Sequence, residues 1–190
     1  MFESTSGGLV AACLLATPGA SQFFISGSIV YTGRGAKRLL PPAVLRASGL
    51  MNQRENYASK AAYVRSKEQY TAAVARDMLD HTKAEVVVCE SGTTGPDFFV
   101  PGVDEGFTSV SVAIRTASAG MALSQPSNQS PIIDSNAAAP TACVVTTKTI
   151  FTGSADRVQN MQHFAFHALT LLRDSLNSAA QRKAPRHSKL

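Results

Sequence analysis

The apolar positions of this chain recur with two periods, one typical of helices and one typical of strands. Spacings of three and four predict helices over four segments, at residues 7–16, 36–40, 66–82 and from about 154 onward. Runs of β-branched residues predict strands over four others, at residues 23–31, 85–90, 108–115 and 141–151. Because the two kinds of element interleave, the sequence predicts an α/β fold with one domain over residues 1–180.

Polar segments separate these elements. Residues 2–8 are expected to form a polar loop before the first helix, and residues 91–96 a tight turn after a strand. Loops of this kind gather at one end of an open α/β sheet and form its site. A capping box at residues 66–69 marks the expected start of the long helix. Residues 117–140, rich in Ser, Ala, Asn and Pro, are expected to be a mobile insertion.

The formal net charge of +5 is not spread over the chain. The flexible tail at residues 181–190 supplies four of the five positive charges and holds no acid, so the rest of the chain is nearly neutral. A nearly neutral domain lacks the broad basic surface that nucleic acids require, and we expect no such partner. No apolar run reaches the roughly 18 residues of a membrane span, so we expect no membrane partner either.

The chain closes on Ser188-Lys189-Leu190. A free Ser-Lys-Leu carboxyl terminus is the address that a peroxisomal import receptor reads. The tripeptide therefore predicts a eukaryotic protein that the receptor carries into peroxisomes.

Candidate chemistry begins in the first loop, where residues 3–8 run into a helix. Free N–H groups at a helix start favour an anion, and Ser4 is placed as a nucleophile would be, although capping by Ser4 or Ser6 explains the same pattern. Lys37 follows Tyr31 across a turn and would serve as a base for a serine if burial lowered its pKa; alone, such a lysine is more often a solvated surface charge. His163 and His167 have a metal-compatible spacing but no third ligand, so we expect no metal site.

Four motifs occur in a fixed order along the chain. They are Glu3-Ser4-x-x-Gly7-Gly8, Pro18-Gly19-Ala20-Ser21, the Gly27 to Tyr31 segment with Lys37, and Ser91-Gly92-x-x-Gly95-Pro96. With this order and spacing, residues 1 to about 178 resemble the family of CinA C-terminal domains, whose characterised members are nicotinamide mononucleotide deamidases. The resemblance implies a compact αβ sandwich, here without the family's first helix and strand because this chain begins almost at the first motif.

The resemblance also implies a reaction and a set of residues. The reaction hydrolyses the amide of nicotinamide mononucleotide to nicotinate mononucleotide and ammonia, without metal or cofactor. Ser4 resembles the nucleophile, Lys37 its base and Tyr31 the hydroxyl that positions the reacting groups. The substrate-binding residues implied are Ser6, Gly7, Gly8, Ser91 and Gly92.

The chain departs from the family in ways that leave rival functions open. The family's substrate-binding arginine falls on Ala155, and Arg157 is the cation expected to replace it. Tyr31 and Lys37 are one residue further apart than is usual, and the loop at residues 100–106 lacks the family's lysine. The alternatives are a catalytically inactive relative that binds a nucleotide or a protein partner, and an amidase for another amide. We also expect a homo-oligomer, with loops of the site between subunits.

Overall fold

A computed structural model describes residues 1–51, 57–96, 102–103, 105–116 and 142–183. Within these residues, five strands form one sheet in the order β2-β1-β3-β4-β5. The strands are β1 (Phe2–Glu3), β2 (Ser28–Ile29), β3 (Val86–Thr93), β4 (Phe107–Arg115) and β5 (Cys143–Phe151). Strand β1 runs parallel to both of its neighbours, whereas β3, β4 and β5 form an antiparallel meander.

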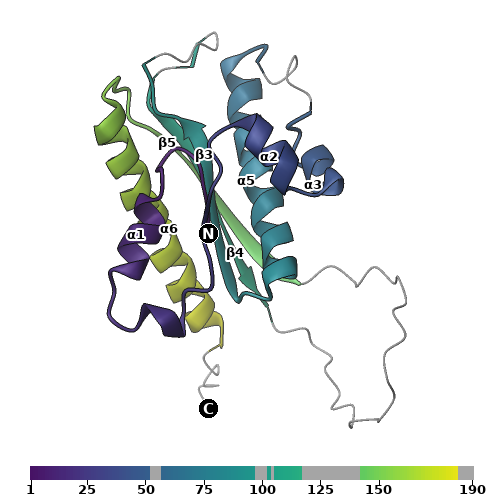
Figure 1. Ribbon diagram of the computed structural model, residues 1–190, viewed down its shortest axis with the longest axis vertical. Helices are drawn as coiled ribbons and strands as arrows, with labels where there is room; N and C mark the ends of the chain where they lie inside the picture. The colour runs from purple at the N-terminus through teal and green to yellow at the C-terminus, as the bar shows by residue number, and fades with distance from the viewer. Residues whose placement is uncertain (52–56, 97–101, 104, 117–141, 184–190) are drawn as a thin grey trace, which may run out of the picture.

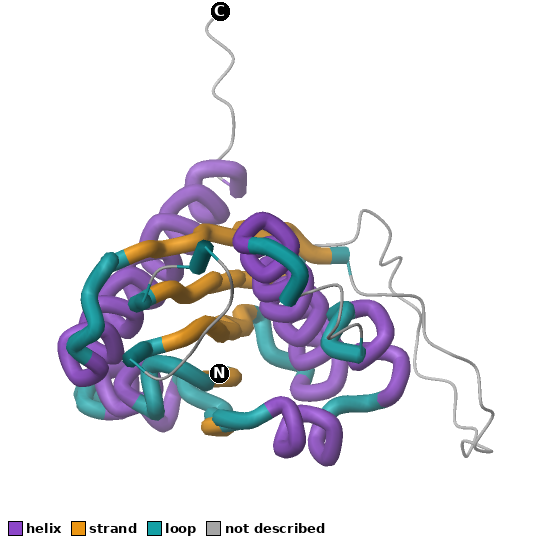
Figure 2. Tube along the Cα trace, turned by 90° about the horizontal axis from the view of Figure 1, so that it is seen from above, coloured by secondary structure: helices purple, strands orange, loops and turns teal. Residues whose placement is uncertain are grey.

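Helices cover both faces of this sheet (Figure 1). They are α1 (Leu9–Leu15), α2 (Gly33–Leu39), α3 (Pro42–Ala47), α5 (Lys60–Thr82) and α6 (Arg157–Lys183), with a 3-10 turn at Ala20–Gln22. Helices α1 and α6 pack together on one face, and α5 lies on the other with α2 and α3 beside it. The view from above shows the strands between these two helical layers (Figure 2). The αβ sandwich expected from the sequence is therefore confirmed.

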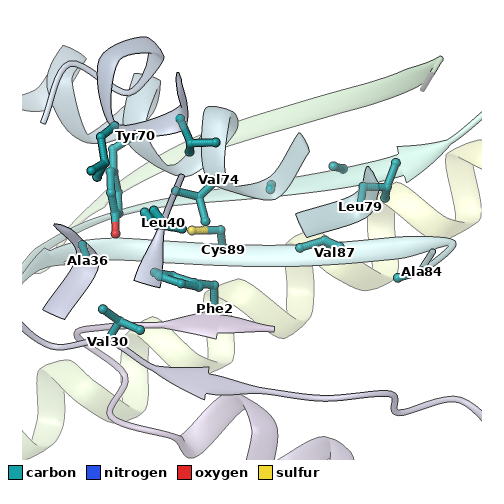
Figure 3. Close-up of a cluster of buried hydrophobic side chains, with 14 residues drawn as sticks. Phe2, Val30, Ala36, Leu40, Tyr70, Val74, Leu79, Ala84, Val87 and Cys89 are labelled. Carbon is teal, nitrogen blue, oxygen red and sulfur yellow. The ribbon is translucent and has the colours of Figure 1, made fainter. Parts of the chain in front are cut away.

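The core between α5 and the sheet combines side chains that are far apart in the sequence. Phe2 on β1 and Cys89 on β3 form a strand pair, and both side chains lie in one apolar cluster with Val74 and Leu79 of α5 (Figure 3). Val10, Val110 and Ala168 belong to the second cluster, under α1 and α6. Burying β1 between two neighbours fixes the position of the loop that follows it, which begins with Ser4.

Two of the predicted strand and loop boundaries are wrong. The expected loop at residues 2–8 starts with β1, because Phe2 is buried against the centre of the sheet. The expected buried strand at residues 23–31 contains only the two-residue β2, and Phe23, Ile25 and Ile29 of this segment are exposed. This segment lies at the edge of the sheet, where one side has no strand to cover it.

The start of the long helix α5 differs from the sequence prediction. The capping box at residues 66–69 lies inside α5, which begins at Lys60 with Ser59 as its N-cap and ends at Thr82 as expected. The Ser59 hydroxyl accepts a hydrogen bond from the Ala62 N–H at 3.2 Å. In α6, Val158 and Leu176 are exposed, and the buried face includes Asn160 and Phe164.

Several expectations lie outside the described residues. They concern the insertion at residues 117–140, residues 100, 101 and 104 of the loop at residues 100–106, and the end of the tail with Ser188, Lys189 and Leu190. Among the helices that the structure describes, none has the length and apolar character needed to cross a membrane.

Candidate functional site

A cavity of about 530 Å³ opens where β1, β3 and α5 meet the segments after β2 and before α6. Its walls come from segments far apart in the sequence, which only the folded sheet brings together. Among the residues that line it are Ser4, Tyr31, Lys67, Ser91, Gly92 and Arg157. The cavity therefore contains most of the side chains that the sequence singled out, together with a lysine that it did not.

Ser4 reaches this cavity because a buried carboxylate holds its backbone. Glu90 on β3 is fully buried and accepts hydrogen bonds from the N–H groups of Ser4 at 2.6 Å and Ser6 at 2.8 Å. The same carboxylate accepts hydrogen bonds from the hydroxyls of Thr5, Ser6 and Thr108. Charge-assisted hydrogen bonds are stronger than neutral ones, so Glu90 fixes the conformation of the loop that presents Ser4.

A second buried carboxylate occupies the start of α1. Glu3 accepts hydrogen bonds from the N–H groups of Gly8, Val10 and Ala11 at 3.0, 3.1 and 2.8 Å, and from the Ser6 hydroxyl at 2.6 Å. These donors are thus satisfied by the protein itself.

This arrangement corrects one part of the expected site. Ser6, Gly7 and Gly8 do not line the cavity, so their predicted role in holding substrate is not supported by the geometry. Gly8 instead adopts a φ of 100° and allows the chain to turn into α1, where a Cβ would lie 2.8 Å from the Ile29 side chain. The glycines make the turn that lets Glu3 cap the helix.

Tyr31 and Arg157 meet at the mouth of the cavity. The Arg157 guanidinium lies 5.5 Å from the centre of the Tyr31 ring and donates a hydrogen bond to the Tyr31 hydroxyl. It also donates to the Gly95 carbonyl oxygen at 3.0 Å. Asp156, the residue before Arg157, accepts a hydrogen bond from the Gln159 N–H at 2.9 Å and so caps α6. Arg157 therefore faces the cavity from the first turn of that helix.

The predicted base lies elsewhere. Lys37 is exposed on α2, and it is not among the residues that line the cavity. Ala36, its neighbour, takes the inward position of α2 and contacts the core. The structure therefore does not bring Lys37 to Ser4, because the helix turns the lysine toward solvent.

A different lysine occupies the cavity wall. Lys67 projects from α5, and its Nζ lies 3.5 Å from the Ser91 Oγ, 5.3 Å from the centre of the Tyr63 ring and 5.9 Å from that of Tyr70. Burial lowers the pKa of Lys67 from 10.5 to about 8, while the nearby Glu90 and Cys89 oppose this change. Sequence reasoning missed Lys67 because it interpreted residues 66–69 as a helix cap, although the Tyr63, Lys67 and Tyr70 spacing marks one helical face.

Ser91 and Gly92 lie on β3 beside this lysine. Since β1 and β3 run parallel from the Phe2 and Cys89 pair, Ser4 and Ser91 each follow that pair by two residues. Both serines line the cavity. Gly92 also lines it, and a Cβ there would lie 1.9 Å from the Phe107 carbonyl oxygen. Gly92 therefore permits β3 and β4 to approach closely under the site.

No third metal ligand joins His163 and His167 in the described part of the chain. It contains no group of three or more His, Cys, Asp or Glu side chains arranged to hold a metal ion. Among the described residues that line the cavity, the reactive groups are serine, threonine and tyrosine hydroxyls, the Lys67 amine and the Arg157 guanidinium.

Comparisons with known proteins show what this chain is similar to. The family model described as the CinA C-terminal domain matches residues 1–142. A competence-damage inducible protein of Symbiobacterium thermophilum is 30% identical over 120 residues, which are 62% of this chain and 25% of that protein. A CinA-like protein of Chlorobaculum tepidum is 28% identical over 115 residues, which are 60% of this chain and 24% of that protein. The chain thus spans about a quarter of the length of these curated relatives.

Solved structures share the fold. The competence or damage-inducible protein from Enterobacter asburiae superposes with a TM-score of 0.61 at 20% sequence identity. The match covers 92% of this chain and 84% of that chain. At this identity the superposition establishes the arrangement of helices and strands.

Proposed function

The chain belongs to the family of CinA C-terminal domains, and on that premise we propose that it hydrolyses the amide of nicotinamide mononucleotide. The products are nicotinate mononucleotide and ammonia. The observation that carries this proposal is the convergence of Ser4, Tyr31, Ser91 and Arg157, from four separate segments, on one cavity. Its volume of about 530 Å³ is in the range of cavities that hold small molecules of this size.

The chemistry follows from the groups that face the cavity. The Ser4 hydroxyl attacks the carbonyl carbon of the amide, ammonia leaves, and water then hydrolyses the ester on Ser4. The N–H groups of Ser4 and Ser6 are already bonded to Glu90 and do not receive the developing negative charge. Tyr31 and Arg157 are the donors at the cavity mouth that supply this stabilisation or bind the phosphate of the nucleotide.

One observation favours a second candidate function. The exposed position of Lys37 removes the base that the family resemblance implied. A relative without that base would bind the nucleotide through Arg157 without hydrolysing it. Ammonia release separates this non-catalytic nucleotide-binding protein from the amidase.

The test uses purified full-length protein with nicotinamide mononucleotide and measures ammonia by a coupled assay. We expect release by the wild type and a loss of at least about 100-fold in Ser4→Ala, because the variant lacks the attacking oxygen. Circular dichroism checks that the variant is folded, which we expect because the substitution removes one oxygen atom and leaves the backbone N–H of residue 4 bonded to Glu90. Binding of the nucleotide in calorimetry without ammonia release would replace the amidase with the non-catalytic function.

The cellular setting completes the proposal. We propose import into peroxisomes through Ser188, Lys189 and Leu190, which would place the reaction in that compartment. Self-association of the chain stays a prediction from the sequence, and light scattering on the purified protein measures it.

A further inference from the structure

We propose that Lys67 is the proton acceptor of this site and that it acts on Ser4 through the hydroxyl of Ser91. The inference rests on the proposed amidase function, because it supplies the base that the reaction needs. It assigns to α5 a part of the chemistry that the sequence had placed on α2.

The geometry begins with the pairing of α5 and β3. Helix α5 lies along the face of the sheet to which Cys89 points, and Ser91 follows on the same face because side chains alternate along a strand. Lys67 lies between Tyr63 and Tyr70 on the inner face of α5, and its Nζ lies 3.5 Å from the Ser91 Oγ. Contact between the amine and a cavity hydroxyl therefore exists before any substrate binds.

Ser91 links this amine to the nucleophile. Strands β1 and β3 are hydrogen-bonded neighbours, and Glu90, the residue before Ser91, holds the Ser4 N–H at 2.6 Å. The two serines thus line adjacent positions of the same cavity. A hydroxyl both donates and accepts a hydrogen bond, so Ser91 can take a proton from Ser4 while it gives its own to Lys67.

The burial of Lys67 favours the neutral form of its amine. Burial lowers its pKa to about 8, so a substantial fraction is neutral near physiological pH. The groups around it are Glu90 and Cys89 on β3 and the Tyr63 and Tyr70 rings on its own helix, with Arg157 across the cavity. Glu90 favours the ammonium form and limits the shift, which leaves the group able both to accept a proton and to return it.

Every proton that Lys67 accepts during one turnover is given up again before the next. As the Ser4 oxygen bonds to the amide carbon, its proton passes to Ser91 and the Ser91 proton passes to Lys67. When the carbon–nitrogen bond breaks, the ammonium of Lys67 returns this proton through the Ser91 hydroxyl to the departing nitrogen, and ammonia leaves. Water then attacks the ester, gives its proton to Lys67 by the same route, and the proton returns to the Ser4 oxygen as the acid is released.

Ammonia release by Lys67 variants tests the assignment. Lys67→Met should lower kcat at least about 100-fold, the scale of a lost general base. Lys67→Arg should also fail, because a guanidinium keeps its proton in this pH range while preserving the charge and much of the packing. The matched control is Lys148→Met on the exposed part of β5, which should stay within about twofold of wild type.

The pH profile separates a base from a structural lysine. In the wild type, kcat/KM should rise with pH, reach half of its maximum near pH 8 and level off about one pH unit higher, as Lys67 loses its proton. The residual activity of Lys67→Met should lack this rise. Wild-type turnover in Lys67→Met, or loss of activity in Lys37→Met with Lys67→Met active, would overturn the proposal.

A second readout does not depend on the amide substrate. A fluorophosphonate reacts with activated serines, and mass spectrometry locates the label. We expect labelling of Ser4 in wild type and in Lys148→Met, and at least about 100-fold slower labelling in Lys67→Met and Lys67→Arg. Lysine-dependent labelling without ammonia release would retain Lys67 as the base and reject the mononucleotide as substrate. Equal labelling of all four proteins would reject Lys67.

Discussion

Arg157 shows how one side chain joins distant parts of this molecule. Its guanidinium contacts the Gly95 carbonyl and the Tyr31 hydroxyl, 62 and 126 residues away in the sequence. These two contacts leave further N–H groups of the five-donor fork available at the cavity mouth. A phosphate can therefore bind to an arginine whose orientation is already fixed.

Replacement of Arg157 tests this arrangement. In Arg157→Ala, nicotinamide mononucleotide should bind more weakly by roughly 1.5–3 kcal/mol, the scale of a hydrogen bond to a charged group. Isothermal titration calorimetry measures the difference, and Arg173→Ala, an exposed arginine on the same helix, is the control. Equal affinity in wild type and Arg157→Ala would remove this residue from the binding site.

Glu90 carries a prediction about stability. Glu90→Gln replaces an oxygen that accepts hydrogen bonds with an amide that must face N–H and O–H donors, at a fully buried position. We expect a loss of about 3 kcal/mol in the free energy of unfolding, measured in urea.

The matched control for this change is Glu85→Gln. The Glu85 side chain is largely exposed, and its Oε1 lies 3.9 Å from the Arg115 Nε. Its neutralisation should therefore change the free energy of unfolding by less than about 1 kcal/mol. Similar losses in both variants would show that the Glu90 hydrogen bonds do not determine how the Ser4 loop is held.

The sequence predicted some residues of the site and could not predict others, for a physical reason. Ser4, Tyr31 and Ser91 lie beside glycines or turns, and such local patterns are visible along the chain. Lys67 and Glu90 act only through partners on other elements, and no local pattern records which side of α5 faces β3. Lys37 shows the same limit, since its sequence position near Tyr31 did not reveal that α2 turns it outward.

Among the elements, helix α5 begins earlier than the sequence predicted. Residues 66–69 have the composition of a capping box, but apolar contacts of Tyr63 with Phe107 continue the helix one and a half turns earlier. Tertiary packing thus outweighs a local signal. The ends of β3, β4 and β5 were predicted within a few residues because each contains a continuous run rich in β-branched residues, which is buried in β3 and β4 and largely exposed in β5.

The cap of α5 can be tested directly. Ser59→Ala should lower the free energy of unfolding by about 1 kcal/mol, because the Ala62 N–H loses its acceptor. Ser59→Asp should retain most of the stability, since its carboxylate also caps a helix. Urea denaturation of the three proteins measures this, and a stability in Ser59→Ala that matches wild type would argue that α5 is anchored by packing alone.

At the scale of the whole molecule, the three-layer arrangement follows from the alternation of helices and strands, and the family match supports it. The basic residues Arg186 and Lys189 lie outside the described part of the chain. They belong to the prediction of cellular location, which the fold does not address.

Removal of Leu190 tests this location. A fluorescent protein fused to the N-terminus should be seen in peroxisomes with the natural tripeptide and in the cytosol without Leu190, because the receptor reads a complete Ser-Lys-Leu end. Lys183→Ala, upstream in the tail, is the control and should leave the location unchanged. Peroxisomal fluorescence after the deletion would show that another signal directs the protein.

The hydrogen bond from the Ser4 N–H to the Glu90 carboxylate joins two residues that the ribosome adds at different times. A ribosome releases Ser4 long before it adds Glu90, and Thr108 follows later still. The nascent segment therefore has neither its strand partner nor its buried acceptor, and contacts of such long sequence separation form late. Ser4, the nucleophile of the proposed reaction, is held in place only when the centre of the sheet closes, so we expect chains that end before Glu90 to lack activity.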